Sequence, residues 1–215
     1  MAIREILQIP HPTLRQRAKR VRAINDSVLR LAYDMVDTMR DAKGVGLAAN
    51  QVGELWRVVV IQLPDEEDAR IYINPEITLR EGERRVEEGC LSIAGYKGFV
   101  MRSVSIRFRA LDHSAKTVKL RAEDMLSQAM EHEVDHLNGI LYTDHMEAHE
   151  KLIKVVEEDE AAPEPDDADA AQDDDTDGTN SADADDAPQA SHAGESGLWL
   201  PEQDSRNTPA TLKIK

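Results

Sequence analysis

Two stretches of the chain repeat hydrophobic residues at helical spacing. The first follows the N-capping sequence at residues 25–27 and stops before Gly44. Its apolar positions are Val28, Leu31, Ala32, Met35 and Met39. The second begins after Ala122 and stops at Gly139, where a left-handed helix cap is expected. A further helix is predicted over about residues 144–156.

The region between the two helices has the patterns of β-strands. Residues 56–63 form an apolar run typical of a buried strand, and residues 71–74 and 77–79 predict two short strands separated by Pro75. Residues 104–110 alternate between apolar and polar side chains, which indicates a half-exposed strand. A turn then joins this strand to the segment TVKL in an antiparallel hairpin.

Charge divides the chain into two parts. Residues 157–215 contain 18 acidic and 3 basic residues, a net charge of −15, whereas residues 1–156 contain 24 and 23, a net charge of −1. No large apolar residue occurs at positions 161–197, so we expect a folded domain over residues 1–156 and a disordered acidic tail beyond it. One apolar island, at residues 198–201, interrupts the tail. The near-neutral body excludes a basic nucleic-acid-binding protein.

Other classes are excluded by local sequence. The apolar run Val58–Ile61 ends at Gln62, far short of the ~20 residues of a bilayer span. Arg4 and Glu5 interrupt the N-terminal apolar patch, so no signal peptide is expected. The single cysteine, Cys90, cannot form an internal disulfide, which favours a reducing, cytoplasmic setting.

The second predicted helix contains the sequence His132-Glu133-Val134-Asp135-His136. Residues four apart lie on one face of a helix, so both imidazoles can reach one metal ion. Glu133, next to the first histidine, is placed to take a proton from a water at the metal. The same pattern occurs in helices whose histidines are merely solvated. A metal centre therefore needs a third ligand.

The candidates for that ligand point to different enzymes. The sequence nearly fits H-E-x-x-H-x-x-G-x-x-H, a pattern of zinc endopeptidases, but Tyr142 stands at its last position and His145 comes three residues too late. A carboxylate would have to come from Glu147, Glu150 or the acidic run that follows. Cys90, in the segment VEEGCLSIAG, offers a thiolate, a strong ligand for zinc or ferrous iron. Cys90 and the two histidines form the better set.

Three segments together resemble a known family. GVGLAANQ, EGCLS and HEVDH occur in the order of the signature segments of peptide deformylase, and the resemblance covers about residues 3–150. It implies that Cys90, His132 and His136 bind the metal and that Glu133 is the general acid and base. It also implies that Gln51 and the backbone N–H of Leu91 stabilise the oxyanion and that Gly46 aligns the substrate.

The resemblance implies both a fold and a reaction. We expect an α+β fold whose antiparallel or mixed β-sheets pack around a central helix carrying HEVDH, with N- and C-terminal helices. The family removes the formyl group from N-formylmethionine at the start of nascent polypeptides, using one divalent metal ion. Ferrous iron is preferred, while zinc, nickel or cobalt also suit the ligands. An apolar pocket for methionine is predicted from Val45, Val86, Met125, Leu126 and Ala129.

The expected partners follow from that reaction. They are formylated nascent peptides and the ribosome, which we expect the protein to contact transiently. No binding to a membrane and no direct binding to nucleic acid is expected. The sequence does not indicate a partner for the tail. Two alternatives stay open: a zinc endopeptidase with another third ligand, and a non-catalytic module whose tail is the functional part. Asn50, Ala94 and Glu131 depart from the family pattern, which questions rates and loop rigidity more than activity.

Overall fold

The computed structural model describes residues 2–155. The predicted acidic tail, with its island at residues 198–201, lies outside the described residues. Within the part described, no helix has both the length and the apolar character needed to cross a bilayer.

The N-terminal part is built on helix α1 (Asp26–Asp41), which confirms the first helix predicted from the sequence. The Asn25 side chain caps it by accepting from the Val28 N–H. Its apolar face packs against strands β1 (Gly46–Ala48) and β2 (Val58–Ile61). A short 3₁₀ helix, η2 (Ala49–Val52), follows β1 directly, and another, η1 (Pro12–Arg15), precedes α1.

Two antiparallel sheets form the rest of the described chain. The larger has the order β1-β2-β3-β6-β7, with β3 at Arg70–Glu81, β6 at Ser105–Leu111 and β7 at Thr117–Glu123. The smaller has the order β4-β5-β8. Its strands are Arg84–Gly89, Tyr96–Arg102 and Ile153–Lys154. The predicted hairpin is therefore the pair β6–β7, and the α+β class with antiparallel sheets is confirmed.

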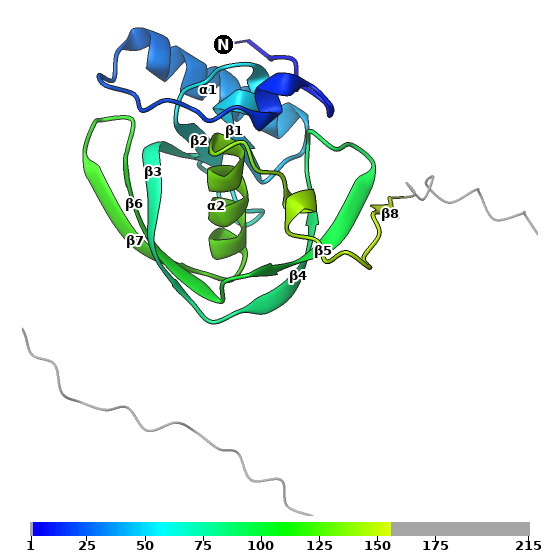
Figure 1. Cartoon of the computed structure of the whole chain (residues 1–215). Helices are drawn as coiled ribbons and strands as arrows, with labels where there is room; N and C mark the ends of the chain where they lie inside the picture. Colours follow the sequence, from blue (N-terminus) through cyan, green and yellow to red (C-terminus); the bar gives the residue numbers. More distant parts are fainter. Residues whose placement is uncertain (1, 156–215) are drawn as a thin grey trace, which may run out of the picture. The chain divides into compact units, whose positions relative to one another are not determined.

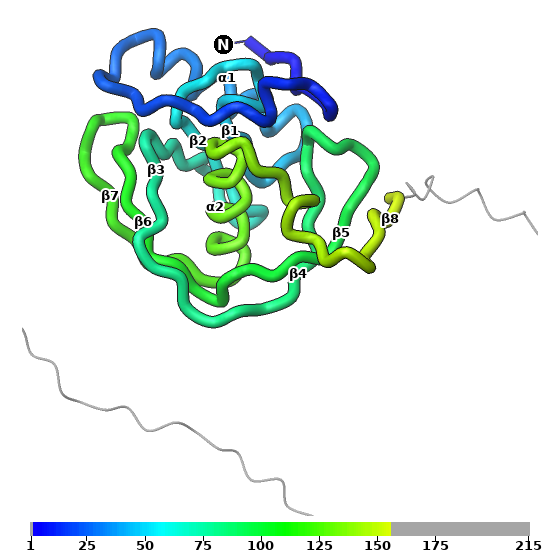
Figure 2. The backbone as a smooth tube through the Cα atoms, viewed as in Figure 1, coloured from blue at the N-terminus to red at the C-terminus, as the bar shows by residue number. Residues whose placement is uncertain are grey.

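Helix α2 (Asp124–Leu137) lies at the centre of the molecule and carries the HEVDH sequence. Figure 1 shows it between the β3-β6-β7 side of the larger sheet and the β4-β5 side of the smaller one, and the backbone trace in Figure 2 shows the same arrangement. Met130, Val134 and Leu137 on α2 are buried with Val59 and Ile61 of β2. The helix ends before Gly139, which has the positive φ of 77° expected of a cap.

The predicted C-terminal helix is wrong. Residues 144–155 contain the end of the 3₁₀ helix η3 (Tyr142–Asp144), turns, and β8. Strand β8 pairs with β5, Tyr96 with Lys154 and Lys97 with Ile153. The open edge of β5 offers backbone partners to this segment, and such tertiary pairing overrides a weak helical preference.

The predicted break at Pro75 is also wrong. Strand β3 continues through it, because the ladder with β6 shifts register between Ile73 and Glu76 and so accommodates a residue without an N–H. Asn74 adopts a φ of 54° at this irregularity.

Candidate active site

The cysteine and the two histidines meet at one point. Cys90 Sγ lies 3.1 Å from His136 Nε2, and that nitrogen lies 3.2 Å from His132 Nε2. One donor atom from each residue lies within 4.8 Å of the others. The two histidines stand one helical turn apart on α2, and Cys90 directly follows the end of β4.

This donor set fits one divalent cation. A thiolate with two neutral imidazoles suits Zn²⁺ or Fe²⁺, and three protein ligands leave a position open for a reactant. Burial lowers the pKa of His136 well below its usual range, so the ring is in the neutral form that binds a cation. The Ser92 N–H donates to the Cys90 sulfur at 3.4 Å, which helps to hold the sulfur in place.

A buried carboxylate orients the first histidine. Glu88 Oε2 lies 2.9 Å from His132 Nδ1. Burial raises the pKa of Glu88, but hydrogen bonds from His132 and Arg102 outweigh that effect and bring the pKa to about 2. An ionised carboxylate can only accept, so His132 Nδ1 donates to Glu88, and this contact turns the Nε2 atom towards Cys90 and His136.

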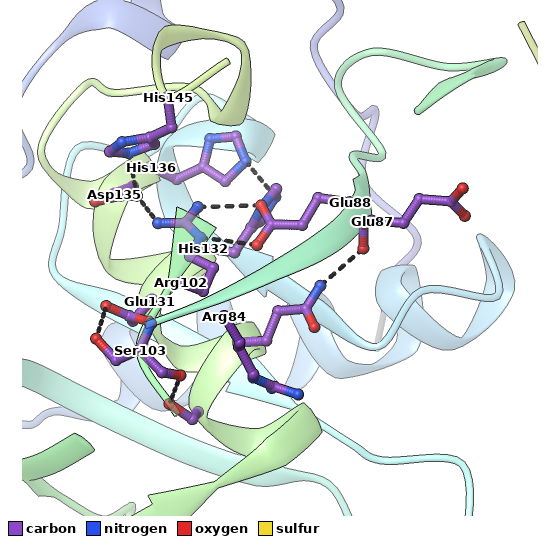
Figure 3. A network of polar contacts seen from close by, with 12 residues as sticks. Arg84, Glu87, Glu88, Arg102, Ser103, Glu131, His132, Asp135, His136 and His145 are labelled. Atoms are coloured by element: carbon purple, nitrogen blue, oxygen red, sulfur yellow. Dashed lines mark hydrogen bonds and ion pairs between the residues drawn. The ribbon is translucent and has the colours of Figure 1, made fainter. Parts of the chain in front are cut away.

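Arg102 connects Glu88 to the second half of the HEVDH sequence. Its guanidinium donates to both Glu88 oxygens, at 2.8 and 3.0 Å, and to Asp135 Oδ2 at 2.6 Å. His145 Nε2 lies 2.8 Å from the same Asp135 oxygen. Figure 3 shows Arg102 between the two carboxylates, with His145 at the outer end of the network. The ring of His132 is thus held in orientation by three linked charged groups, those of Glu88, Arg102 and Asp135.

Removing the arginine should destabilise the protein. In Arg102→Met, Glu88 and Asp135 stay buried without a cation, which typically costs about 3–5 kcal/mol. At roughly 2–4 °C per kcal/mol, the unfolding temperature should fall by about 10 °C. Thermal unfolding at saturating metal measures the change.

Arg109→Met is the matched control. Arg109 also pairs with a glutamate, Glu76, at 2.9 Å, but both side chains are about half exposed, so the loss should stay below about 1 kcal/mol. Equal losses in the two variants would contradict the structural role of Arg102.

Glu133 lies beside the metal ligands with one oxygen unsatisfied. The residue is 4% exposed, and its Oε2 has no hydrogen-bond partner among the described residues. Burial raises its pKa to about 7. A Cβ at Gly46 of β1 would overlap the Glu133 carboxylate, so any larger residue there would require this carboxylate to move. A buried unpaired oxygen at a cavity wall indicates a partner supplied by a reactant.

Two neutral donors flank the same space. Gln51, on η2, accepts the Ala48 N–H on its Oε1 at 2.8 Å, which leaves its amide N–H₂ directed to Ser92 Oγ at 3.2 Å and Cys90 Sγ at 3.7 Å. Leu91 follows the cysteine, and within residues 2–155 its N–H donates to no protein acceptor. Both groups can therefore donate to an oxygen in the site.

The site opens into a cavity of about 640 Å³. Its walls include the candidate metal ligands Cys90 and His132 together with Glu133, Gln51 and Leu91. Of the predicted substrate-binding residues, Val45, Gly46, Met125 and Ala129 line it. The cavity thus brings together residues from β1, the β4–β5 connection and α2.

Val86 and Leu126 are the exceptions among the predicted pocket residues, because neither lines this cavity. Leu126, on α2, packs against the core cluster that contains Val59 and Ile61 of β2. Val86 lies on β4 two residues before Glu88, so both side chains are on the same face of the strand. At Val86 this face packs against a separate apolar cluster. The cluster consists of Leu14, Ile93, Val100, Leu141 and Tyr142. Hydrophobicity alone could not predict whether Val86 lines the cavity or packs in this cluster.

The three departures from the family pattern all have contacts. Asn50 is fully buried and donates from Nδ2 to the backbone carbonyl of His136. Glu131 accepts the Ser103 N–H at 2.8 Å and Arg80 Nε at 2.8 Å, which ties α2 to the β5–β6 connection. The Ala94 N–H donates to Gln8 Oε1 at 3.3 Å.

Sequence reasoning missed the residues that orient the site. Neither Glu88 nor Arg102 was predicted to act on a histidine, although Glu88 stands two positions before Cys90 and could have been suspected from that spacing. Arg102 gives no local signal, because its partners come from β4 and α2.

The fold and the site define a class of protein: a metal-dependent hydrolase whose HExxH helix faces a cysteine. The sequence matches the polypeptide deformylase family over residues 3–152. It is 45% identical over 160 residues to the peptide deformylase of Dehalococcoides mccartyi strain CBDB1, which covers 74% of this chain and 96% of that protein. The chain belongs to the peptide deformylase family and is an enzyme of that family.

Solved structures give the same assignment. The peptide deformylase from Legionella pneumophila is 41% identical with a TM-score of 0.66, covering 68% of this chain and 88% of that one. The peptide deformylase from Synechococcus elongatus in complex with actinonin is 36% identical with a TM-score of 0.65, covering 67% and 79%. Neither a zinc endopeptidase nor a non-catalytic module is supported by these similarities.

Proposed function

We propose that this protein hydrolyses the formyl group of N-formylmethionine at the start of nascent polypeptides, at the centre formed by Cys90, His132 and His136. The observation that carries the proposal is the convergence of these three donor atoms within 4.8 Å beside a buried carboxylate with an unpaired oxygen. A divalent cation held there would supply Lewis acidity to the carbonyl and to the attacking water.

The other steps follow from the chain's own groups. Glu133 takes a proton from the attacking water, whose oxygen bonds to the formyl carbon. Negative charge then develops on the former carbonyl oxygen, within reach of the Gln51 amide and the Leu91 N–H; one such donor is worth about 2.7–4 kcal/mol of barrier. Glu133 returns the proton to the amine as the C–N bond breaks, giving formate and a free N-terminus.

We propose ferrous iron as the native metal, as the resemblance to the family implies. The same three ligands also accept zinc, nickel or cobalt. Metal analysis of protein purified without oxygen, compared with protein purified in air, decides the identity: iron in the anaerobic sample supports the proposal, and zinc alone contradicts it.

The walls next to Glu133 suit a preference for formyl over larger acyl groups. Gly46 and Leu91 line the cavity beside Glu133, and we propose that they exclude an acetyl methyl group by steric clash. Formate release from formyl-Met-Ala-Ser should therefore be rapid, acetyl-Met-Ala-Ser should be inert, and actinonin should inhibit. Turnover of the acetylated peptide at a comparable rate would contradict the proposal.

A methyl group at Gly46 should disturb the catalytic carboxylate. In Gly46→Ala the added Cβ overlaps Glu133, so the carboxylate must move by about 1 Å, a displacement that can cost about 10²-fold in rate. Steady-state kinetics should show the loss in kcat, while metal content stays at the wild-type level because the ligands are untouched. A wild-type kcat would show that the carboxylate has room to shift.

Residues 1–156 are proposed as the whole catalytic domain. A variant ending at residue 156 should keep kcat and KM within about twofold, because every described residue of the site lies before that point. Large loss of turnover would instead make the acidic segment part of the enzyme. A cytoplasmic location and a transient ribosome contact are proposals that follow from the nature of the substrate.

A further inference from the structure

A dense group of positive charges lies outside the active site. Five cations occur within residues 15–22, which contain no acidic residue, and all five are exposed. They are Arg15, Arg17, Lys19, Arg20 and Arg22. Leu14, Ala18 and Val21 are buried in the same stretch. The segment therefore fixes its apolar side chains in the protein and directs its charge to solvent.

The backbone of this segment is held in place at several points. Lys19 pairs with the start of the larger sheet, its N–H donating to Leu55 O at 2.8 Å and its carbonyl accepting from Arg57 N–H at 2.9 Å. The Asn74 side chain bonds both backbone groups of Val21, at 2.8 and 2.9 Å. The Asn74 backbone has a φ of 54°, in the left-handed region that residues other than glycine adopt uncommonly. The cations thus stand on a preorganised frame.

Three of these five cations line a hollow of about 800 Å³, which we call the basic groove, whereas Arg15 and Arg17 lie outside its lining. Its charged walls are Lys19, Arg20 and Arg22, and Trp56 forms another wall with 41% of its surface exposed. The groove shares no lining residue with the active-site cavity. Trp56 thus leaves part of a large apolar ring exposed to solvent beside the cations, and tryptophan is enriched at binding interfaces.

Most of the charge of the groove has no counter-ion. Among residues 2–155, Arg17, Lys19 and Arg22 make no ion pair, and Arg20 reaches Glu76 only at 3.9 Å. Burial and then repulsion by Arg17 and Arg20 lower the pKa of Arg57, which follows Trp56 in the sequence. Like charges held close together on a fixed frame repel one another, and a bound polyanion relieves that repulsion.

We propose that the basic groove, together with the exposed Arg17 that precedes it in the sequence, binds single-stranded RNA, with phosphates on Arg17, Lys19 and Arg22 and a base stacked on Trp56. Single-strand binding combines a row of cations along the backbone with an aromatic stacking surface, and the groove has both. An acidic peptide would use the cations but has no need of the indole. The average charge of −1 over residues 1–156 excludes a generally basic protein, whereas this contact is local.

The test measures RNA binding by the full chain. Fluorescence anisotropy with a labelled oligouridine of ~12 nucleotides gives the Kd. The variant R17E/K19E/R22E should bind at least about tenfold more weakly than wild type at about 50 mM salt. Three phosphate contacts predict a slope of log K against log salt of about −2, which should approach zero in the variant.

A matched control separates the groove from overall charge. R107E/K116E/K119E reverses three exposed cations on the β6–β7 hairpin, none of which makes an ion pair in the described part of the chain, and so changes net charge equally. It should keep RNA affinity within about twofold of wild type. Formate release should be unchanged in both variants, which shows that they fold.

The role of Trp56 distinguishes RNA from other anions. W56A should weaken RNA binding by about tenfold, and RNA should quench Trp56 fluorescence in a W199F background, which removes the second tryptophan of the chain. Oligoglutamate of the same charge should compete poorly. The proposal is overturned if wild type does not bind the RNA, if both triple variants lose affinity equally, if W56A binds like wild type, or if oligoglutamate competes as well as RNA.

Discussion

Replacing Glu133 by Gln should lower kcat for formyl-Met-Ala-Ser by about 10²- to 10⁴-fold, the usual contribution of a general acid–base group. The amide keeps the size of the side chain next to Gly46 but can neither take nor return a proton. KM should change little, because Glu133 acts on the reacting atoms and the cavity walls stay in place. A formate-release assay gives both constants.

The neighbouring carboxylate provides the matched control. Glu131→Gln makes the same chemical change two residues earlier on α2, where Glu131 bonds Ser103 and Arg80 outside the site. Its kcat at 25 °C should stay within a few-fold of wild type, and metal content should be the same in both variants. Retained turnover in Glu133→Gln, or equal losses in the two, would remove Glu133 from its proposed role.

Helix caps and apolar spacing in the sequence were sufficient to predict the helices that carry these signals. Asn25 and the apolar spacing that follows it define α1, and Gly139 defines the end of α2. Strands β4 and β5 went unpredicted because their alternation carries charged residues: Glu88 and Arg102 occupy inward positions where hydrophobic residues are expected. They pair with each other inside the protein, which no single-strand pattern reveals.

The prediction of a C-terminal helix was wrong for a different reason. The helical pattern at residues 144–156 is weak, and the outcome depends on the free edge of β5, which lies about fifty residues earlier in the sequence. Such a partner is visible only once the smaller sheet is known. The misplacement of Val86 has the same origin, since its neighbours come from strands and loops that the sequence did not place together.

The candidate site was more predictable than the fold around it. The two histidines are fixed by helical spacing, and Cys90 was chosen by the chemistry of a thiolate and by the resemblance of three segments. Asp135 was considered as an orienting residue because it lies between the two histidines, but Glu88 and Arg102 were not predicted, because they act through contacts between separate elements. Ligands leave signals in the sequence through their residue type, whereas the groups that orient them do so only through geometry.

The structure also shows why the other third ligands considered from the sequence are unavailable. His145 Nε2 is directed to Asp135 at 2.8 Å. Glu150 pairs with Arg85 at 2.6 Å, and Glu147 lies 3.5 Å from His149. Each of these three side chains therefore has another partner, and the acidic run from residue 157 lies outside the described residues. Within residues 2–155, Cys90 is the residue whose donor atom is grouped with those of the two histidines.

Cys90→Ser should therefore lose both metal and activity. A hydroxyl is a far poorer ligand than a thiolate for these cations, and removing a direct ligand should weaken metal binding by more than the about 10- to 100-fold that orienting residues cost. Metal per chain after gel filtration should fall close to zero, and formate release with it. His145→Asn, which alters the outer end of the network, should keep its metal. If Cys90→Ser retained one metal per chain while His145→Asn lost it, the third ligand would lie beyond α2 and the proposed centre would be wrong.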